Sequence, residues 1–345
     1  MPSKEAFDIF IVESPLQLLN AIEANNYLSK GGKQKRTLLI LCYSLNEKGN
    51  DQLKLLKGLI KWDEIIEVTY KSKFDFFKIF FSLRNDIKTL TARNIFIGEF
   101  RAPWMHVLSE NILHEEKFLL DDGAGTPARQ ENDLNLEIPS MFYEGEGNNL
   151  NVIVKKVYLK LLGLKYLQWK NQINLFTVFD LEAYDGQKIV RNNYEYLRKS
   201  CEKTGQKTIN EVAFIGTALV EAGIVSNSYY LCCLEKVASL YGGYNVVYIP
   251  HRRESNDKLN EIHDRFGYEI RHFNYLIEYE FIISSTLPYK IICFPTMAAI
   301  TLNRLFPSIE IEMIKLASQN IKEKYRKGTL KNYALYKDIV NIVDF

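Results

Sequence analysis

The sequence has few cysteines, and no pattern among them predicts a zinc site or a disulfide framework. Their number is odd, no Cys-X-X-Cys pair occurs, and most of them lie in apolar runs. This usage is typical of a protein in a reducing compartment and argues against structural zinc. The five are Cys42, Cys201, Cys232, Cys233 and Cys293.

Long hydrophobic runs and an excess of charge of one sign are also missing. No apolar run reaches the roughly 20 residues that a membrane-spanning helix requires. Residues 7–12 read as a strand with no signal peptide in front of it. A net charge of +2 is too small to indicate a nucleic-acid partner. We therefore expect a cytoplasmic protein.

What remains is the composition of an ordinary soluble globular chain. It has 345 residues, of which 47% are hydrophobic and 25% charged. This length favours two domains over one.

Strand-like apolar runs alternate with helical patterns through the first half of the chain. Ser14 suits the N-cap of the first helix and Pro15 its first position. The alternation predicts a parallel sheet with helices on both faces. Expected strands cover 7–12, 37–42, 65–69, 94–98 and 117–120, and expected helices cover 16–28, 51–61, 74–90 and 105–113.

A polar segment at 130–150 predicts a surface loop, and a basic segment at 151–170 follows it. A basic helix with an apolar side either lies on an anionic membrane or covers a sheet with a solvated lysine edge, and both readings remain open. A charged helix is expected at 190–201. The lysines of the basic segment are Lys155, Lys156, Lys160, Lys165 and Lys170.

The strand and helix alternation restarts after a boundary at 205–211. Two α/β halves of comparable size predict two Rossmann-like domains with parallel sheets facing a central cleft, the architecture called GT-B. We assign residues 1–207 to an N-terminal domain and 208–345 to a C-terminal domain, which in GT-B enzymes are the acceptor domain and the nucleotide-sugar domain. In GT-B enzymes the last helix often crosses back to the N-terminal domain. Expected strands are 212–215, 245–249, 269–272 and 290–294, with helices at 228–240, 258–266, 276–283 and 297–305.

The stretch from Phe118 to Thr126 is the one around which the chain is organised. Its apolar run ends in Asp121 and Asp122, and Gly123 then allows a tight turn. Ligands bind at this edge of parallel sheets, and repulsion between the carboxylates should raise one pKa, as suits a general base. The alternative is an Asp-Gly turn that caps the backbone. Because adjacent side chains point to opposite sides, we predict no metal.

Two strand ends in the second half carry groups that suit an anion. His251 lies beside Arg252 and Arg253 and is suited to holding a phosphate or protonating a leaving group. The Thr296 hydroxyl and the N–H groups from Met297 onward suit an anion at a helix N-terminus. A surface histidine in a basic turn and a simple N-cap threonine are the alternatives.

Together these segments resemble bacterial sialyltransferases, the group containing glycosyltransferase family 52 and the capsule polysialyltransferases. Asp121-Asp122-Gly123, then His251, then Thr296 follow the order of an acidic-acidic-Gly turn, a His-Pro dipeptide and a Ser/Thr turn. The resemblance extends from residue 7 to 307. Flanking segments that fit are Ser14-Pro15-Leu16-Gln17, Phe214-Ile215-Gly216 and Leu276-Ile277-Glu278-Tyr279.

The sequence departs from that pattern in two places. Pro250 precedes His251, so that the His-Pro order is inverted. Pro295-Thr296-Met297 supplies one hydroxyl where many relatives have two. Ser284-Ser285-Thr286 offers further hydroxyls, but the pattern places them at a helix end, before Pro288 and a strand. These departures bear on the donor more than on the reaction type.

The resemblance implies an inverting, metal-independent transfer of sialic acid from CMP-sialic acid to a capsule or lipooligosaccharide hydroxyl. Asp121 would be the general base, with Asp122 tuning its pKa or fixing the turn. His251 and Thr296 would stabilise the leaving phosphate, and Glu278 would hold the ribose, with Glu280 as its rival. Further nucleotide contacts are expected from Gly216, Arg252 and Met297, and donor or acceptor contacts from Ser14, Gln17, Arg101 and Gly123.

Other donors and other classes remain open. CMP-Kdo-type sugars, other nonulosonates and UDP-hexoses are rival donors, and a non-catalytic nucleotide-binding relative is the rival class. A lipid-linked acceptor would favour weak electrostatic attachment to the inner face of the membrane, through the basic segment or a C-terminal stretch. No cofactor is expected. The C-terminal stretch comprises Lys315, Lys322, Lys324, Arg326, Lys327 and Lys331.

Overall fold

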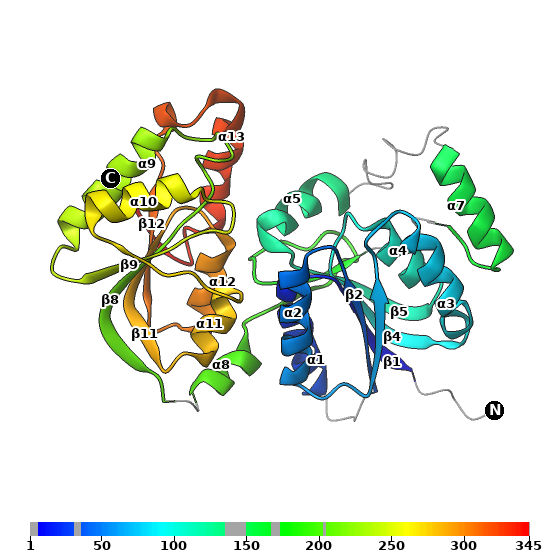
Figure 1. The fold of residues 1–345 in the computed structure, drawn as a ribbon. Helices are drawn as coiled ribbons and strands as arrows, with labels where there is room; N and C mark the ends of the chain where they lie inside the picture. The colour runs from blue at the N-terminus through cyan, green and yellow to red at the C-terminus, as the bar shows by residue number, and fades with distance from the viewer. Residues whose placement is uncertain (1–5, 31–35, 135–149, 167–172, 203–204, 345) are drawn as a thin grey trace. The chain divides into compact units, whose positions relative to one another are not determined.

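The chain divides into two compact units, residues 1–192 and 193–345 (Figure 1). The computed structural model describes residues 6–30, 36–134, 150–166, 173–202 and 205–344. Helix α8 (Glu195–Glu202) packs on α11 (Ile277–Ile283) and α12 (Met297–Leu305). These contacts place α8 in the C-terminal unit. The sequence analysis put the domain boundary between residues 207 and 208, and so assigned the residues of α8 to the N-terminal domain.

The N-terminal unit is built on a parallel sheet of seven strands in the order β3-β2-β1-β4-β5-β6-β7. The inner strand β1 is buried along its whole length, as its apolar sequence FDIFIV requires. The strand order reverses between β1 and β4, and this topological switch point is where ligands bind in such sheets. The strands are β1 (Phe7–Val12), β2 (Thr37–Tyr43), β3 (Glu64–Thr69), β4 (Thr91–Ile97), β5 (Leu113–Leu120), β6 (Asn174–Thr177) and β7 (Ile189–Arg191).

Helices follow the strands of this sheet. Ser14 caps the first helix by accepting a hydrogen bond from the Gln17 N–H, and Pro15 is its first residue, as expected. The second helix begins earlier than expected because the Asn46 side chain caps it by accepting from the Gly49 N–H. The helices are α1 (Pro15–Ser29), α2 (Glu47–Leu56), α3 (Asp75–Thr89), α4 (Pro103–Glu110), α5 (Thr126–Arg129) and α7 (Leu150–Leu161).

The C-terminal unit has its own parallel sheet of six strands in the order β10-β9-β8-β11-β12-β13. Its switch point lies between β8 and β11. The last helix, α13 (Glu323–Asn332), is followed by β13, and both belong to this unit. The strands are β8 (Lys207–Ile215), β9 (Asn245–Ile249), β10 (Glu269–Ile270), β11 (Thr286–Cys293), β12 (Glu310–Lys315) and β13 (Asn341–Asp344), and the remaining helices are α9 (Asn227–Leu240) and α10 (Asn256–Phe266).

Two expectations about local structure are wrong. Pro288 lies inside β11 rather than before it, at a register irregularity where β11 pairs only with β8, so that its missing N–H costs no ladder hydrogen bond to β12. The helix expected over 190–201 is strand β7 followed by α8, and Tyr194 between them has a φ of 50°.

Each unit has its own hydrophobic core on a sheet face, with Ile9, Ile40 and Ile97 in one and Val212, Tyr248 and Ile292 in the other. The predicted α/β class, with two Rossmann-like units that each have a parallel sheet, is confirmed. Within the described ranges, no helix combines the length and the apolar character needed to cross a membrane. Residues 135–149 of the predicted polar loop and 167–170 of the basic segment lie outside the described residues.

Candidate functional site

Asp121 and Asp122 follow β5 and point to opposite sides, as the sequence predicts. Asp121 is fully buried. Its Oδ1 accepts hydrogen bonds from the hydroxyls of Thr126 (2.6 Å) and Thr177 (2.8 Å), and its Oδ2 accepts one from the Val178 N–H (2.8 Å). The Asp121 carboxylate therefore joins β5, α5 and the end of β6.

Burial dominates the ionisation of Asp121. Desolvation raises its pKa to about 6, against the opposing effect of its three hydrogen bonds. The side chain is fully buried and its three hydrogen bonds all come from groups of the same unit, so that its oxygens are not exposed to an acceptor hydroxyl in this structure. This geometry favours a structural position for Asp121, and its role as the general base stays a prediction.

Asp122 is exposed, and its carboxyl is held by groups from two other strand ends. Its Oδ1 accepts a hydrogen bond from the Ser14 hydroxyl at 3.1 Å. Gln17 also donates to it, and it shares a hydrogen bond with Glu99. Desolvation by these surrounding groups, followed by the hydrogen bond and charge of Glu99, raises the Asp122 pKa to about 7. The partner that raises this pKa is thus Glu99, and not the adjacent Asp121 as the sequence suggested.

Three carboxylates meet at the switch point of the N-terminal sheet, which we call the carboxylate cluster: Glu13, Glu99 and Asp122. Glu13 follows β1, Glu99 follows β4, and Asp122 follows β5, which are neighbouring strands. Burial and the charge of Glu99 raise the Glu13 pKa, while a 3.2 Å hydrogen bond from Trp104 Nε1 opposes the rise. A protonated carboxyl and a carboxylate can share such a site, which is how a base becomes poised near neutral pH.

Gln17 links the cluster to the backbone. Its Oε1 accepts a hydrogen bond from the Glu13 N–H at 2.8 Å. It packs so closely on Gly98 that a Cβ there would lie 2.2 Å from Oε1. Gly98 is therefore needed for this close approach, and Gln17 is fixed where it can orient Asp122.

Two further predicted residues lie at this edge. The Arg101 N–H donates to Glu99 Oε1 at 2.7 Å, and the Arg101 side chain is 65% exposed. Gly123 has a φ of 76°, the left-handed region that favours glycine, in the turn directly after Asp122. Among the residues that the structure describes, no group of three His, Cys, Asp or Glu side chains is placed to hold one metal ion.

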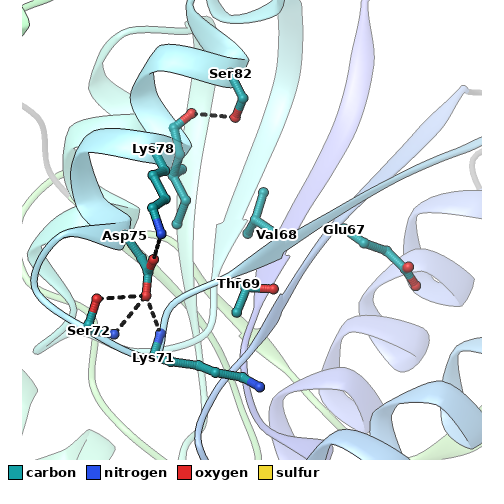
Figure 2. Close-up of a pocket in the computed structure, with 9 residues that line it drawn as sticks. Glu67, Val68, Thr69, Lys71, Ser72, Asp75, Lys78 and Ser82 are labelled. Atoms are coloured by element: carbon teal, nitrogen blue, oxygen red, sulfur yellow. Dashed lines mark hydrogen bonds and ion pairs between the residues drawn. The ribbon is translucent and has the colours of Figure 1, made fainter.

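A cavity of about 610 Å³ lies at the same edge, between the end of β3 and the start of α3 (Figure 2). Asp75 organises its floor, since its carboxylate accepts hydrogen bonds from the N–H groups of Lys71 and Ser72 and pairs with Lys78 at 3.1 Å. These bonds lower the Asp75 pKa to about 2. Strand β3 is two positions from β1, which is about 10 Å at ordinary strand spacing. The cavity lining is Glu67, Val68, Thr69, Lys71, Ser72, Asp75, Lys78, Ile79 and Ser82.

In the C-terminal unit, His251 follows β9 and is held as a neutral imidazole. Its Nδ1 accepts a hydrogen bond from the Arg253 N–H at 3.2 Å, which leaves the proton on Nε2. Burial, followed by the charges of Arg253 and Arg252, lowers the His251 pKa. His251 is therefore suited to donate a hydrogen bond from Nε2, while the exposed Arg252 and Arg253 supply positive charge.

The buried carboxylate of Glu254 holds the turn that contains His251 in place. Glu254 accepts hydrogen bonds from the His251 N–H (2.6 Å) and the Tyr248 hydroxyl (2.6 Å), and it pairs with Lys258 at 2.6 Å. At Gly216, which follows β8, a Cβ would lie 2.3 Å from Glu254 Oε2 and 2.6 Å from the Tyr248 hydroxyl. Gly216 thus makes room for this support.

The third strand end of this sheet is that of β11, next to β8. Thr296 is the N-cap residue of α12, but its hydroxyl makes no capping hydrogen bond. Met297 is the first residue of the helix. His251, Gly216 and Thr296 therefore lie at the ends of the neighbouring strands β9, β8 and β11, as predicted, with a hydroxyl and the N-terminus of α12 at the switch point.

Glu278 lies elsewhere in the unit. It is buried between α11 and α12, where the Thr301 hydroxyl donates to its Oε1 at 2.5 Å and desolvation raises its pKa. Its rival Glu280 accepts hydrogen bonds from the N–H groups of Asn274 and Tyr275. The ribose role of Glu278 stays a prediction.

Sequence reasoning missed three residues of these sites: Glu13, Glu99 and Glu254. Glu13 and Glu99 carry a readable signal, because each comes directly after a predicted strand, as Asp121 does. Glu254 has no such signal, since its role depends on the fold of the turn above it.

No protein-family model matches the sequence, and no curated protein sequence is similar to it. Several solved structures are similar along nearly the whole chain. An alpha/beta-galactoside alpha-2,3-sialyltransferase of Photobacterium phosphoreum is 10% identical, with a TM-score of 0.49, over 98% of this chain and 99% of its own. A UDP-GlcNAc 2-epimerase of Neisseria meningitidis bound to UDP-GlcNAc is 12% identical, with a TM-score of 0.49, over 98% and 95%. The E. coli heptosyltransferase WaaC with ADP is 7% identical, with a TM-score of 0.45, over 96% and 97%. Similarity at this level assigns no activity.

Proposed function

We propose that this protein is a glycosyltransferase that moves sialic acid, or a related nonulosonate, from its CMP-activated donor to a hydroxyl of a cell-surface glycan. The observation that carries the proposal is the Asp122 carboxyl at the switch point of the N-terminal sheet. It is exposed, its pKa is raised to about 7, and Ser14, Gln17 and Glu99 hold it in place. These are the properties of a general base that works near neutral pH.

The reaction follows from that assignment. Asp122, rather than the enclosed Asp121, takes the proton of the acceptor hydroxyl as its oxygen attacks the anomeric carbon. The bond from that carbon to the CMP phosphate breaks on the opposite face, so that the configuration inverts. The proton remains on Asp122, and the electron pair of the broken bond leaves with CMP.

The leaving phosphate needs groups that stabilise negative charge. The Nε2–H of His251, the Arg252 guanidinium, the Thr296 hydroxyl and the first N–H groups of α12 have that chemistry. Because its pKa is lowered, His251 would act as a neutral hydrogen-bond donor and not as an acid. No step of this scheme uses a metal.

The decisive experiment offers the full-length protein CMP-sialic acid, CMP-Kdo and UDP-hexoses separately, in EDTA, and measures nucleotide release and sugar transfer. We expect CMP release and inverted product with the CMP-nonulosonate, and neither with the Asp122→Asn variant. If only a UDP-hexose is turned over, the proposed donor is wrong and the proposed glycosyl transfer still holds. An activity that EDTA abolishes and Mg²⁺ or Mn²⁺ restores would overturn the metal-independent mechanism. Binding of CMP without turnover of any donor would favour a non-catalytic nucleotide-binding protein.

A further inference from the structure

The solvent-facing side of helix α7, in the N-terminal unit, is apolar, whereas this side of a surface helix is normally polar. Five large apolar residues of this twelve-residue helix are exposed, by 46% to 80%. At 100° per residue they fall within an arc of about 100° on one side of the helix. Monomeric soluble proteins rarely present such a stripe to water. The five are Leu150, Ile153, Val154, Val157 and Leu161.

The opposite side of α7 fixes the helix to the unit, so that the stripe faces outward. Leu159 is buried in the hydrophobic core. The Tyr158 ring packs edge-on against Phe77 of α3 (centroids 4.9 Å apart), and its hydroxyl donates to the Phe77 carbonyl at 2.8 Å. Figure 1 shows α7 beside α3 at the outside of the N-terminal unit.

Helix α3 extends the apolar surface. Phe74 is 75% exposed and Phe81 is 55% exposed. At helical spacing both share a side with Phe77, the residue that contacts α7. We call the five residues of the stripe, with Phe74 and Phe81, the α7 surface.

Lysines border the α7 surface, and α7 contains no acidic residue. Lys156 and Lys160 are exposed and lie along one edge of the stripe. Lys155 reaches over the Phe76 ring at 4.6 Å, and the exposed Lys73 lies close enough to act on it electrostatically. The charged side chains that α7 itself carries beside the stripe are therefore all lysines.

We propose that the α7 surface docks on an anionic lipid membrane, with α7 lying along the interface and its lysines on the headgroups. An apolar stripe on a helix with lysines beside it is the pattern of interfacial helices, and each lysine near anionic lipid adds to the attraction. A second copy of the chain fits less well, because a symmetric contact through α7 would bring lysines against lysines with no carboxylate on the helix to pair with them.

The test is co-sedimentation of the full-length protein with vesicles of mixed phosphatidylglycerol and phosphatidylcholine, compared with phosphatidylcholine alone. We expect binding to the mixed vesicles that weakens with added salt. Val157→Ser with Leu161→Ser should lower the partition coefficient about tenfold or more, since two buried apolar side chains are removed. Lys156→Glu with Lys160→Glu should lower it by a similar factor.

Two matched variants serve as controls. Leu240→Ser removes an equally exposed leucine from α9, and Lys324→Glu with Lys327→Glu reverses charge on α13. Both should bind like the unchanged protein, and circular dichroism should show every variant folded. The proposal is overturned if the unchanged protein stays in the supernatant with both vesicle types, or if only the α13 variant loses binding. It is also overturned if the Val157 and Leu161 changes abolish a dimer in vesicle-free solution and leave vesicle binding intact. None of these readouts depends on catalysis, so they stand apart from the proposed reaction.

Discussion

Adjacent residues with the same carboxyl group have different environments at the end of β5. Asp121 points into the unit and satisfies two hydroxyls and an N–H, whereas Asp122 points out toward Ser14 and Glu99. Side chains alternate along an extended segment, and this alternation alone places the Asp121 carboxyl inside the unit and the Asp122 carboxyl at its surface.

Substitutions should separate the two roles. Asp121→Ala leaves three buried donors without their acceptor, and we expect it to lower the free energy of unfolding by about 2–4 kcal/mol. Asp122→Asn removes a charge that folding penalises at neutral pH, so it should not lower that free energy, and it should lower kcat by about two orders of magnitude or more. Urea unfolding and steady-state transfer assays measure the two quantities. Near-normal turnover in Asp122→Asn would indicate that Asp121, and not Asp122, is the general base.

The pH dependence of the reaction should report the pair of Asp122 and Glu99. With a pKa of about 7, Asp122 is protonated in acid, so kcat/KM should fall below neutral pH. Glu99→Gln removes a charge that raises this pKa, and the acidic limb of the profile should move to lower pH. Glu115→Gln, an exposed change on β5, should leave the profile in place.

The same pair has a consequence for stability. Because folding raises the Asp122 pKa above its ordinary value of 3.8, the contribution of this group to stability is complete below that value and is lost as the pH rises through about 7. Glu99→Gln should reduce this loss in unfolding titrations. An unchanged loss would show that Glu99 does not act on Asp122.

His251 offers a test of hydrogen bonding against proton transfer. His251→Ala removes the Nε2 donor, and we expect kcat to fall roughly 10²- to 10³-fold. His251→Gln places an amide N–H near the same position and should recover part of the loss. Equal loss in both variants, together with a pKa of His251 in the pH profile, would instead favour an acid.

At the scale of elements, helix ends account for much of the local structure. Gly267 closes α10 with a φ of 69°, and nothing lies near its Cβ position. Gly267→Ala should therefore cost about 1 kcal/mol of stability through backbone strain alone. Gly243→Ala, at an equally open position without positive φ, is the control. Equal effects of the two changes on chemical denaturation would contradict this account.

The elements that the sequence predicts well are those with strong periodicity or clear end signals. Strand β9 and helix α12 begin and end where expected, and Ser14 and Pro15 begin α1. Strand β6 was missed and has only four residues, and the three residues of β7 were assigned mostly to a charged helix at 190–201. The last element that the sequence analysis predicted is the helix at 297–305. Strands β12 and β13 and helix α13 follow it and were not predicted.

The sequence predicted which strand ends carry the site residues, but it did not predict which side chains contact one another there. Parallel topology brings Asp122, His251 and Thr296 to the carboxyl edges of their sheets. The burial of Asp121 depends on Thr177 and Val178, more than fifty residues away in the chain. Such partners are decided by packing, which local sequence does not encode.

At the scale of the whole molecule, two separate cores predict two unfolding events. Phe80 and Phe294 are fully buried, one in each core. Phe80→Ala should destabilise the N-terminal unit by about 3–5 kcal/mol and lower only one calorimetric transition, and Phe294→Ala should lower the other. Added CMP should raise the transition that Phe294→Ala lowers. A single transition that both variants shift equally would show that the units unfold together.

Helix α3 lines the cavity of Figure 2 on one side, and Phe81 and the N-cap residue Phe74 lie on an adjacent side. An α-helix with its side chains is only about 10 Å across. On a protein docked through the α7 surface, the cavity mouth would therefore stand about one helix width above the lipid headgroups. A molecule that enters this cavity on a docked protein would therefore do so within about one helix width of the membrane surface.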